Sequence, residues 1–189
     1  PAPARQGRAE VNGIKLSYGV YGEGPPLILL HGGAGNGDHW SGQLAALAAK
    51  FQVFVVDLRG HGRSTRDSKP ISYELMADDL LALMDELELA RAALVGWSDG
   101  GVVALDVAIR HPERVRALVL SAPPFEVVLR ATMLKVRLAQ LVVRVWPGFS
   151  QQTTILPSML SHDPAVVQAH NEDPLVHYTM SARLFFEFR

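Results

Sequence analysis

Short continuous apolar runs alternate with amphipathic stretches along the first two thirds of the chain. Continuous apolar runs of this length are typical of strands that are buried on both faces of a sheet. They predict strands over residues 25–30, 52–58, 91–97 and 115–123. Between these runs, apolar side chains recur at helical spacing, which predicts helices within residues 38–51, 73–89 and 99–111. Strands that alternate with helices in this way predict crossover connections and a mostly parallel sheet with flanking helices.

Two local signals set the ends of predicted elements. Asn12-Gly13 lies between two short alternating runs and predicts the two-residue turn of a β-hairpin. Ser72 precedes the amphipathic stretch 73–89 and is a candidate N-cap for that helix. With the two strands of the hairpin, residues 1–123 are expected to form a six-stranded α/β core.

The pattern changes at Pro123-Pro124, after which no further strand is predicted. Residues 124–189 are expected to form a separate region of helices and loops, of the kind that makes a lid or cap.

One stretch of this region, residues 125–146, is largely apolar but carries three arginines at seven-residue steps, Arg130, Arg137 and Arg144. A basic amphipathic helix of this type can lie on a lipid surface. It can equally form a cap that keeps its basic stripe in water and turns its apolar side to an active site.

Composition and charge narrow the class of protein. The chain has 189 residues, 48% of them hydrophobic and 20% charged, which is ordinary for one folded domain with or without a large insertion. A net charge of -1 gives no electrostatic reason to expect nucleic acid as a partner. The absence of cysteine excludes disulfides and cysteine-ligated metals. No apolar run approaches the roughly 20 residues that span a bilayer, and the N-terminal segment lacks the apolar middle of a signal peptide, so we expect a soluble, cytoplasmic protein.

The candidate chemistry centres on Ser98, which stands between Gly96 and Gly100 in a G-x-S-x-G sequence. This motif is informative where it joins a strand to a helix, and here it falls between the predicted strand 91–97 and helix 99–111. A serine in so tight a turn needs glycine two positions away on each side, because larger side chains would clash. The N-terminus of the following helix would direct free N–H groups at an oxyanion. The alternative is a structural turn that happens to contain serine.

Three segments, LILLHGGAGNGDHW (27–40), VVDLRGHGRS (55–64) and LVGWSDGG (94–101), resemble the α/β-hydrolase superfamily in their order and spacing. The resemblance implies that Ser98 is the nucleophile on a nucleophile elbow, and that the backbone N–H groups of Gly33 and Asp99 form the oxyanion hole. It also implies that the Asp99 carboxylate is solvated or caps the helix, and that Asp57 and Arg59 tie down their loop.

The last third, with WPGF (146–149) and MLSHDPAVVQAHNEDPLVHYTMSARL (159–184), resembles the lid region of bacterial monoacylglycerol lipases and lysophospholipase-like hydrolases. The superfamily places an acid and then a histidine after the nucleophile, on loops that follow two further strands. The sequence ends at LFFEFR without a counterpart of those strands, so we expect the last two strands to be absent and the chain to be truncated.

The usual catalytic base therefore has no counterpart in the sequence. The candidates to replace it are the histidines of the lid-like region: His162, His170 and His177. Their spacings of 8 and 7 place no tight ligand pair on one helical turn, so no metal is expected, and no organic cofactor is implied. Each of the three is also an ordinary surface or capping residue in the alternative interpretation.

The sequence as a whole predicts a serine hydrolase that cleaves carboxylic esters, of small or medium acyl chain or monoacylglycerol-like, through an acyl-enzyme. The first alternative is a catalytically incomplete fragment or a non-catalytic binding protein on the same fold. A second keeps the fold but cleaves carbon–carbon bonds or carries out perhydrolysis. An unpaired sheet edge would also allow a homo-oligomer, and the basic helix a transient contact with lipid.

Overall fold

The computed structural model describes residues 2–124, 133–146, 149–152, 158, 161–176 and 179–181. The chain forms two compact units, Pro1–Pro124 and Phe125–Arg189. Among the described residues, no helix has both the length and the apolar character needed to cross a bilayer.

A six-stranded sheet forms the first unit, in the order β1-β2-β4-β3-β5-β6. The first two strands are antiparallel to their neighbours, and the other four run parallel to one another, which confirms the mostly parallel α/β core. The strands are β1 (Arg5–Val11), β2 (Ile14–Tyr21), β3 (Pro26–Leu30), β4 (Gln52–Val56), β5 (Ala92–Trp97) and β6 (Val115–Ser121).

The predicted hairpin joins β1 to β2. Asn12 and Gly13 both have positive φ, at 47° and 80°, as a two-residue hairpin turn requires. The last residue of β1, Val11, pairs with the first of β2, Ile14, so the register starts directly at the turn.

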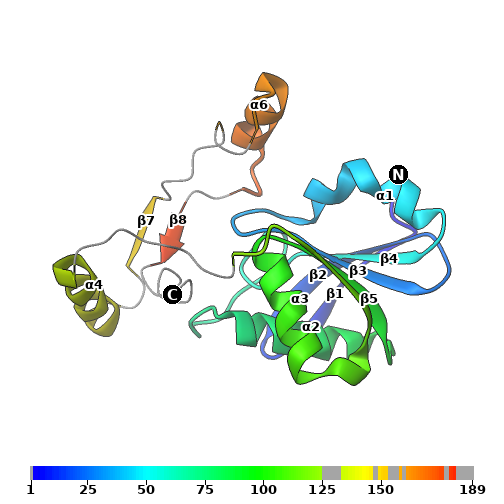
Figure 1. Cartoon of the computed structure of the whole chain (residues 1–189), viewed down its shortest axis with the longest axis horizontal. Helices are drawn as coiled ribbons and strands as arrows, with labels where there is room; N and C mark the ends of the chain where they lie inside the picture. The colour runs from blue at the N-terminus through cyan, green and yellow to red at the C-terminus, as the bar shows by residue number, and fades with distance from the viewer. Residues whose placement is uncertain are drawn as a thin grey trace. The chain divides into compact units, whose positions relative to one another are not determined.

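Helices cover both faces of the sheet, with α1 on one side and α2 and α3 on the other (Figure 1). The Ser72 hydroxyl accepts a hydrogen bond from the Leu75 N–H at 3.1 Å, which confirms Ser72 as the N-cap of α2. The helical elements of the first unit are η1 (Gly37–Trp40), α1 (Ser41–Ala48), α2 (Tyr73–Glu86), α3 (Asp99–Arg110) and η2 (Pro112–Arg114).

The order of strands determines where a site can form. Strands β3 and β5 are parallel neighbours, and Leu30 at the end of β3 pairs with Gly96 at the end of β5. The loops that follow these two strands therefore emerge at one edge of the sheet, which is where open α/β sheets bind their ligands.

The second unit contains α4 (Met133–Val145) and α6 (Pro164–Glu172), as well as two short strands, β7 (Ser150–Gln152) and β8 (Thr179–Ser181). The strands form a separate antiparallel pair, so the prediction that the chain has no strand after residue 123 is wrong. Each strand is only three residues long and mostly polar, so neither produces an apolar run or an alternation that sequence can show.

Candidate active site

The turn at Ser98 has the strained geometry that the G-x-S-x-G sequence predicts. Ser98 connects β5 to α3 with φ 52° and ψ -122°, a conformation that costs a non-glycine residue about 1–3 kcal/mol. Its backbone is held on both sides: its N–H donates to the Ser121 carbonyl at 2.8 Å, and its carbonyl accepts from the Gly101 N–H at 2.8 Å. A rigid connection between strand and helix therefore holds a half-exposed serine in place.

The two glycines of the motif let backbone pass close to backbone. A Cβ atom at Gly96 would collide with the Gly100 carbonyl, and one at Gly100 would collide with the Leu30 and His31 carbonyls. These contacts confirm that the motif needs hydrogen as a side chain at both positions. They also fix the Ser98 turn against the end of β3.

The loop that follows β3 lies directly beside the serine. A Cβ at Gly32 would be 3.1 Å from the Ser98 Cβ, and a Cβ at Gly33 would collide with the Asp99 carboxyl group. Three residues proposed for the site from sequence, Gly33, Ser98 and Asp99, are therefore neighbours. Gly33 is exposed, so its backbone is accessible, and Asp99 is the first residue of α3, where N–H groups lack helical partners.

The Asp99 carboxyl group differs from expectation. The side chain is neither solvated nor a helix cap: Asp99 is 8% exposed, and its Oδ1 accepts a hydrogen bond from the Tyr73 hydroxyl at 3.0 Å. It folds inward because Gly33 has no side chain to exclude it. Burial raises the pKa of Asp99, and the hydrogen bond from Tyr73 opposes that rise. Nothing in the sequence pattern singles out Tyr73, which comes from α2.

His31 connects the exit loops of β3 and β4. Its Nδ1 lies 2.7 Å from the Gly32 carbonyl and its Nε2 accepts from the Leu58 N–H at 3.0 Å, so the neutral Nδ1–H tautomer satisfies both contacts. The side chain is fully buried. His31 therefore supports the Gly32-Gly33 loop.

Asp57 and Arg59 hold the loop after β4, as predicted. Asp57 accepts from the Gly37 and Arg63 N–H groups at 2.7 and 2.8 Å. Arg59 is fully buried and makes a two-pronged contact with Asp79 of α2, at 2.6 and 2.7 Å.

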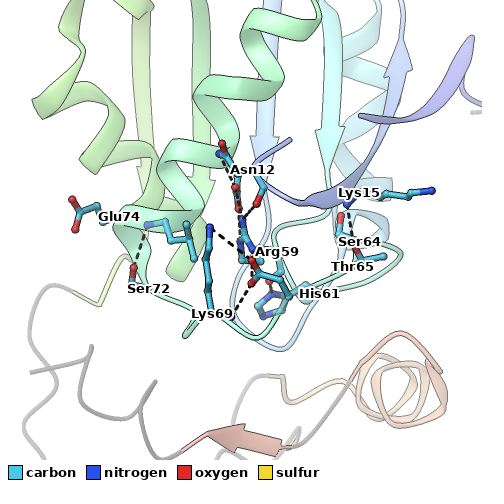
Figure 2. A network of polar contacts seen from close by, with 12 residues as sticks. Asn12, Lys15, Arg59, His61, Ser64, Thr65, Lys69, Ser72 and Glu74 are labelled. Carbon is cyan, nitrogen blue, oxygen red and sulfur yellow. Dashed lines mark hydrogen bonds and ion pairs between the residues drawn. The ribbon is translucent and has the colours of Figure 1, made fainter. Parts of the chain in front are cut away.

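Figure 2 shows how this network reaches the hairpin: the Arg59 guanidinium lies 3.4 Å from the Asn12 carbonyl, and the His61 ring lies 2.9 Å from the Arg59 carbonyl. Burial lowers the pKa of Arg59, but hydrogen bonds and charge from Asp79 and Asp67 outweigh it and raise the pKa. Arg59 is charged at every pH of interest, and the network is structural.

The candidates for the base lie in the second unit. His162 is exposed before α6, His170 lies in the last turn of that helix, and His177 lies outside the described residues. Within the described part of the chain, no side chain hydrogen-bonds to the Ser98 hydroxyl. A catalytic role for any of the three histidines therefore stays a prediction.

A cavity of about 340 Å³ opens beside the serine turn. Trp97 precedes Ser98, and the Ser121 carbonyl accepts the Ser98 N–H, so two of the lining residues are direct neighbours of Ser98. The full lining is His39, Trp40, Gln43, Val95, Trp97 and Ser121. Aromatic and aliphatic surface dominates it, as in sites that take an apolar group.

Residues 26–189 match a family model described as serine aminopeptidase, S33. The chain belongs to this family of α/β-hydrolases. This assignment confirms the superfamily and the fold that the three motifs indicate.

Several hydrolases are similar to this chain. A pimeloyl-[acyl-carrier protein] methyl ester esterase from Aeromonas hydrophila is 40% identical over 116 residues, which are 59% of this chain and 44% of that protein. A monoacylglycerol lipase structure from Paleococcus ferrophilus is 27% identical, with a TM-score of 0.78 over 92% of this chain and 70% of that one. An enol-lactonase from Burkholderia xenovorans LB400 is 29% identical, with a TM-score of 0.69 over 90% and 68%. The matched segment spans less than half the length of the first curated relatives.

Proposed function

We propose that this protein is a serine hydrolase that cleaves carboxylic esters through an acyl-enzyme, with Ser98 as the nucleophile. The observation that carries the proposal is the Ser98 turn itself, with φ 52° at a half-exposed serine that lies beside Gly32, while the exposed Gly33 lies beside Asp99. Strain of this kind persists only where the surrounding structure enforces it, and it gathers at functional sites.

In the proposed reaction, the Ser98 Oγ attacks the ester carbonyl carbon and the carbonyl electron pair moves to oxygen. The Gly33 and Asp99 N–H groups would hold that oxyanion, and a base takes the Ser98 proton. Collapse of the tetrahedral intermediate expels the alcohol, which receives the proton, and leaves an acyl-serine. Water then attacks the acyl group by the same sequence, which releases the acid and restores Ser98.

The ester class is supported by the names of three of these relatives. A methyl ester, a monoacylglycerol and an enol-lactone are all carboxylic esters. The apolar cavity beside Ser98 supports a small or medium acyl chain or a monoacylglycerol-like lipid. His162, His170 and His177 are the residues of this chain proposed as the base.

Turnover of a p-nitrophenyl ester series from acetate to octanoate tests this function. Ser98→Ala should lower kcat/KM at least 10³-fold, because the covalent route is lost. Ser68→Ala is the matched control, since Ser68 is an exposed serine that belongs neither to the Ser98 turn nor to the lining of the cavity. Equal turnover by the wild type and Ser98→Ala would contradict the proposal.

A second function is favoured by one observation: no side chain of the described residues makes a hydrogen bond to the Ser98 hydroxyl. A protein with an unactivated serine would bind an ester without cleaving it. Saturable binding of a non-hydrolysable ether analogue, with ester turnover no faster than that of Ser98→Ala, would support this binding function over the hydrolase.

A further inference from the structure

The surface of α4 carries an apolar stripe that is more than half exposed. Leu138 is 53% exposed, Leu141 58% and Val145 77%. At 100° per residue these positions fall within about 60° of one another around the helix axis, so they form a single continuous stripe. Exposed apolar surface of this extent on one element indicates an interaction site.

Two aromatic side chains follow the end of the helix. Trp146 is 64% exposed, and its ring centroid lies 5.7 Å from that of Phe149 in an edge-to-face arrangement. The Trp146 N–H donates to the Val142 carbonyl at 2.7 Å, and the Phe149 N–H donates to the Trp146 carbonyl at 3.0 Å. Tryptophan is enriched where a protein surface meets the boundary between lipid headgroups and acyl chains.

Charge identifies the kind of partner. The sequence of α4 contains Lys135, Arg137 and Arg144 and no acidic residue. Arg137 and Arg144 are exposed, and their positions lie about 40–60° from Leu141 around the axis, along one border of the stripe. Arginines beside an apolar stripe can keep their guanidinium groups at headgroup level while their stems follow the apolar surface.

We propose that α4, with Trp146 and Phe149, is a surface that adsorbs to anionic lipid, and we call these residues the α4 face. With 13 residues the helix is about 20 Å long, shorter than the hydrocarbon core of about 30 Å, so it lies in the plane of the interface. Apolar contact and attraction to anionic headgroups add together in this arrangement. The inference does not need the proposed hydrolase activity, because adsorption is measured without turnover.

Cosedimentation of the full chain with phosphatidylcholine vesicles, with and without 30% phosphatidylglycerol, tests the proposal. The wild type should bind the anionic vesicles more tightly, and 0.5 M salt should weaken that binding. Arg137→Gln with Arg144→Gln should lower the affinity for anionic vesicles about 25-fold, which is about fivefold for each charge removed. The affinity of this variant for vesicles of phosphatidylcholine alone should be unchanged. Leu141→Glu with Val145→Glu should lower the affinity for both vesicles at least tenfold.

The matched control is Val166→Glu, an exposed apolar residue on α6 that lies outside the α4 face. It should bind as the wild type does. Equal binding to both vesicle types, or an equal loss in Val166→Glu, would overturn the proposal. A wild type that binds neither type of vesicle would also overturn the proposal. If the unfolding midpoint of the Leu141→Glu, Val145→Glu variant were then lower than that of the wild type, the α4 face would be packed against protein.

Discussion

The two faces of the six-stranded sheet are covered very differently. On the face under α2 and α3, one continuous cluster buries twenty hydrophobic residues contributed by strands and helices. On the face under α1, the buried cluster has only five: Leu27, Leu29, Leu44, Val53 and Val55. The same strands supply both clusters, since alternate residues of β3 and β4 point to opposite sides.

β6 shows the difference most clearly. Leu118 and Leu120 pack against the larger cluster, while Val119 between them is 55% exposed. Parallel pairing with β5 forms the strand, and burial of Leu118 and Leu120 on one face stabilises it. The comparison shows that stability in the first unit comes mainly from the face under α2 and α3, whereas the cavity beside Ser98 opens toward the thinner face, next to Val95.

Breaking the buried ion pair on the α2 side should have the largest effect. Arg59→Met removes both hydrogen bonds to Asp79, which is 1% exposed, and leaves that carboxylate buried without its cation. We expect a loss of about 3–5 kcal/mol in the free energy of unfolding, measured by urea denaturation. Arg59→Met with Asp79→Leu should recover most of the loss, because no charge is then buried. A double variant as unstable as the single one would contradict this explanation.

A matched pair of leucines compares the two faces directly. Leu80→Ala, in the large cluster, should cost about 3–4 kcal/mol, whereas Leu44→Ala, in the small one, should cost about 2 kcal/mol. The reason is that a thin layer can relax into the space that the side chain leaves. Urea denaturation with equal m-values in both variants checks this prediction, and equal losses would show that the two faces contribute alike.

Asp99→Asn should give a smaller effect that depends on pH. Burial raises the pKa of Asp99, so the folded state loses stability as pH rises from about 4 through the raised pKa. The amide stays neutral and still offers an oxygen to the Tyr73 hydroxyl. The variant should therefore gain more stability over the wild type at pH 7.5 than at pH 4, in thermal melts at both values. If the difference in stability between Asp99→Asn and the wild type were the same at both pH values, the Asp99 carboxylate would not be buried as described.

Val119→Thr should have the smallest effect, below about 0.5 kcal/mol, because the side chain is exposed and threonine keeps the β-branched shape. A loss above about 1 kcal/mol in chemical denaturation would mean that another element or a second copy covers this strand. Pairing between copies at the edge strand β6 otherwise stays a prediction.

The sequence predicted the core well because its signals are local and strong. The apolar runs of β3 and β4, the Asn12-Gly13 turn and the Ser72 cap each depend on residues close together in the chain. The Ser98 turn was predictable for the same reason, because glycine at positions 96 and 100 marks the places where the turn has no room for a side chain.

What sequence could not predict depends on contacts between distant residues. The hydrogen bond between Tyr73 and Asp99 joins residues 26 apart, and only the fold reveals that Gly33 leaves room for the carboxyl group. The strands β7 and β8 are too short and too polar for a periodic signal. Their pairing across 26 or more intervening residues leaves no trace in either segment alone.

Labelling of the 189-residue chain with a fluorophosphonate probe tests the central claim most directly. Trypsin should release peptide 92–110, in which Ser98 is the only serine, so mass spectrometry locates the adduct without ambiguity. We predict rapid labelling of this peptide, none in Ser98→Ala, and unchanged labelling in Ser68→Ala, whose serine is exposed and lies outside the cavity. A chain that is folded by circular dichroism but stays unlabelled at Ser98, or carries the label on another serine, would contradict Ser98 as an activated nucleophile.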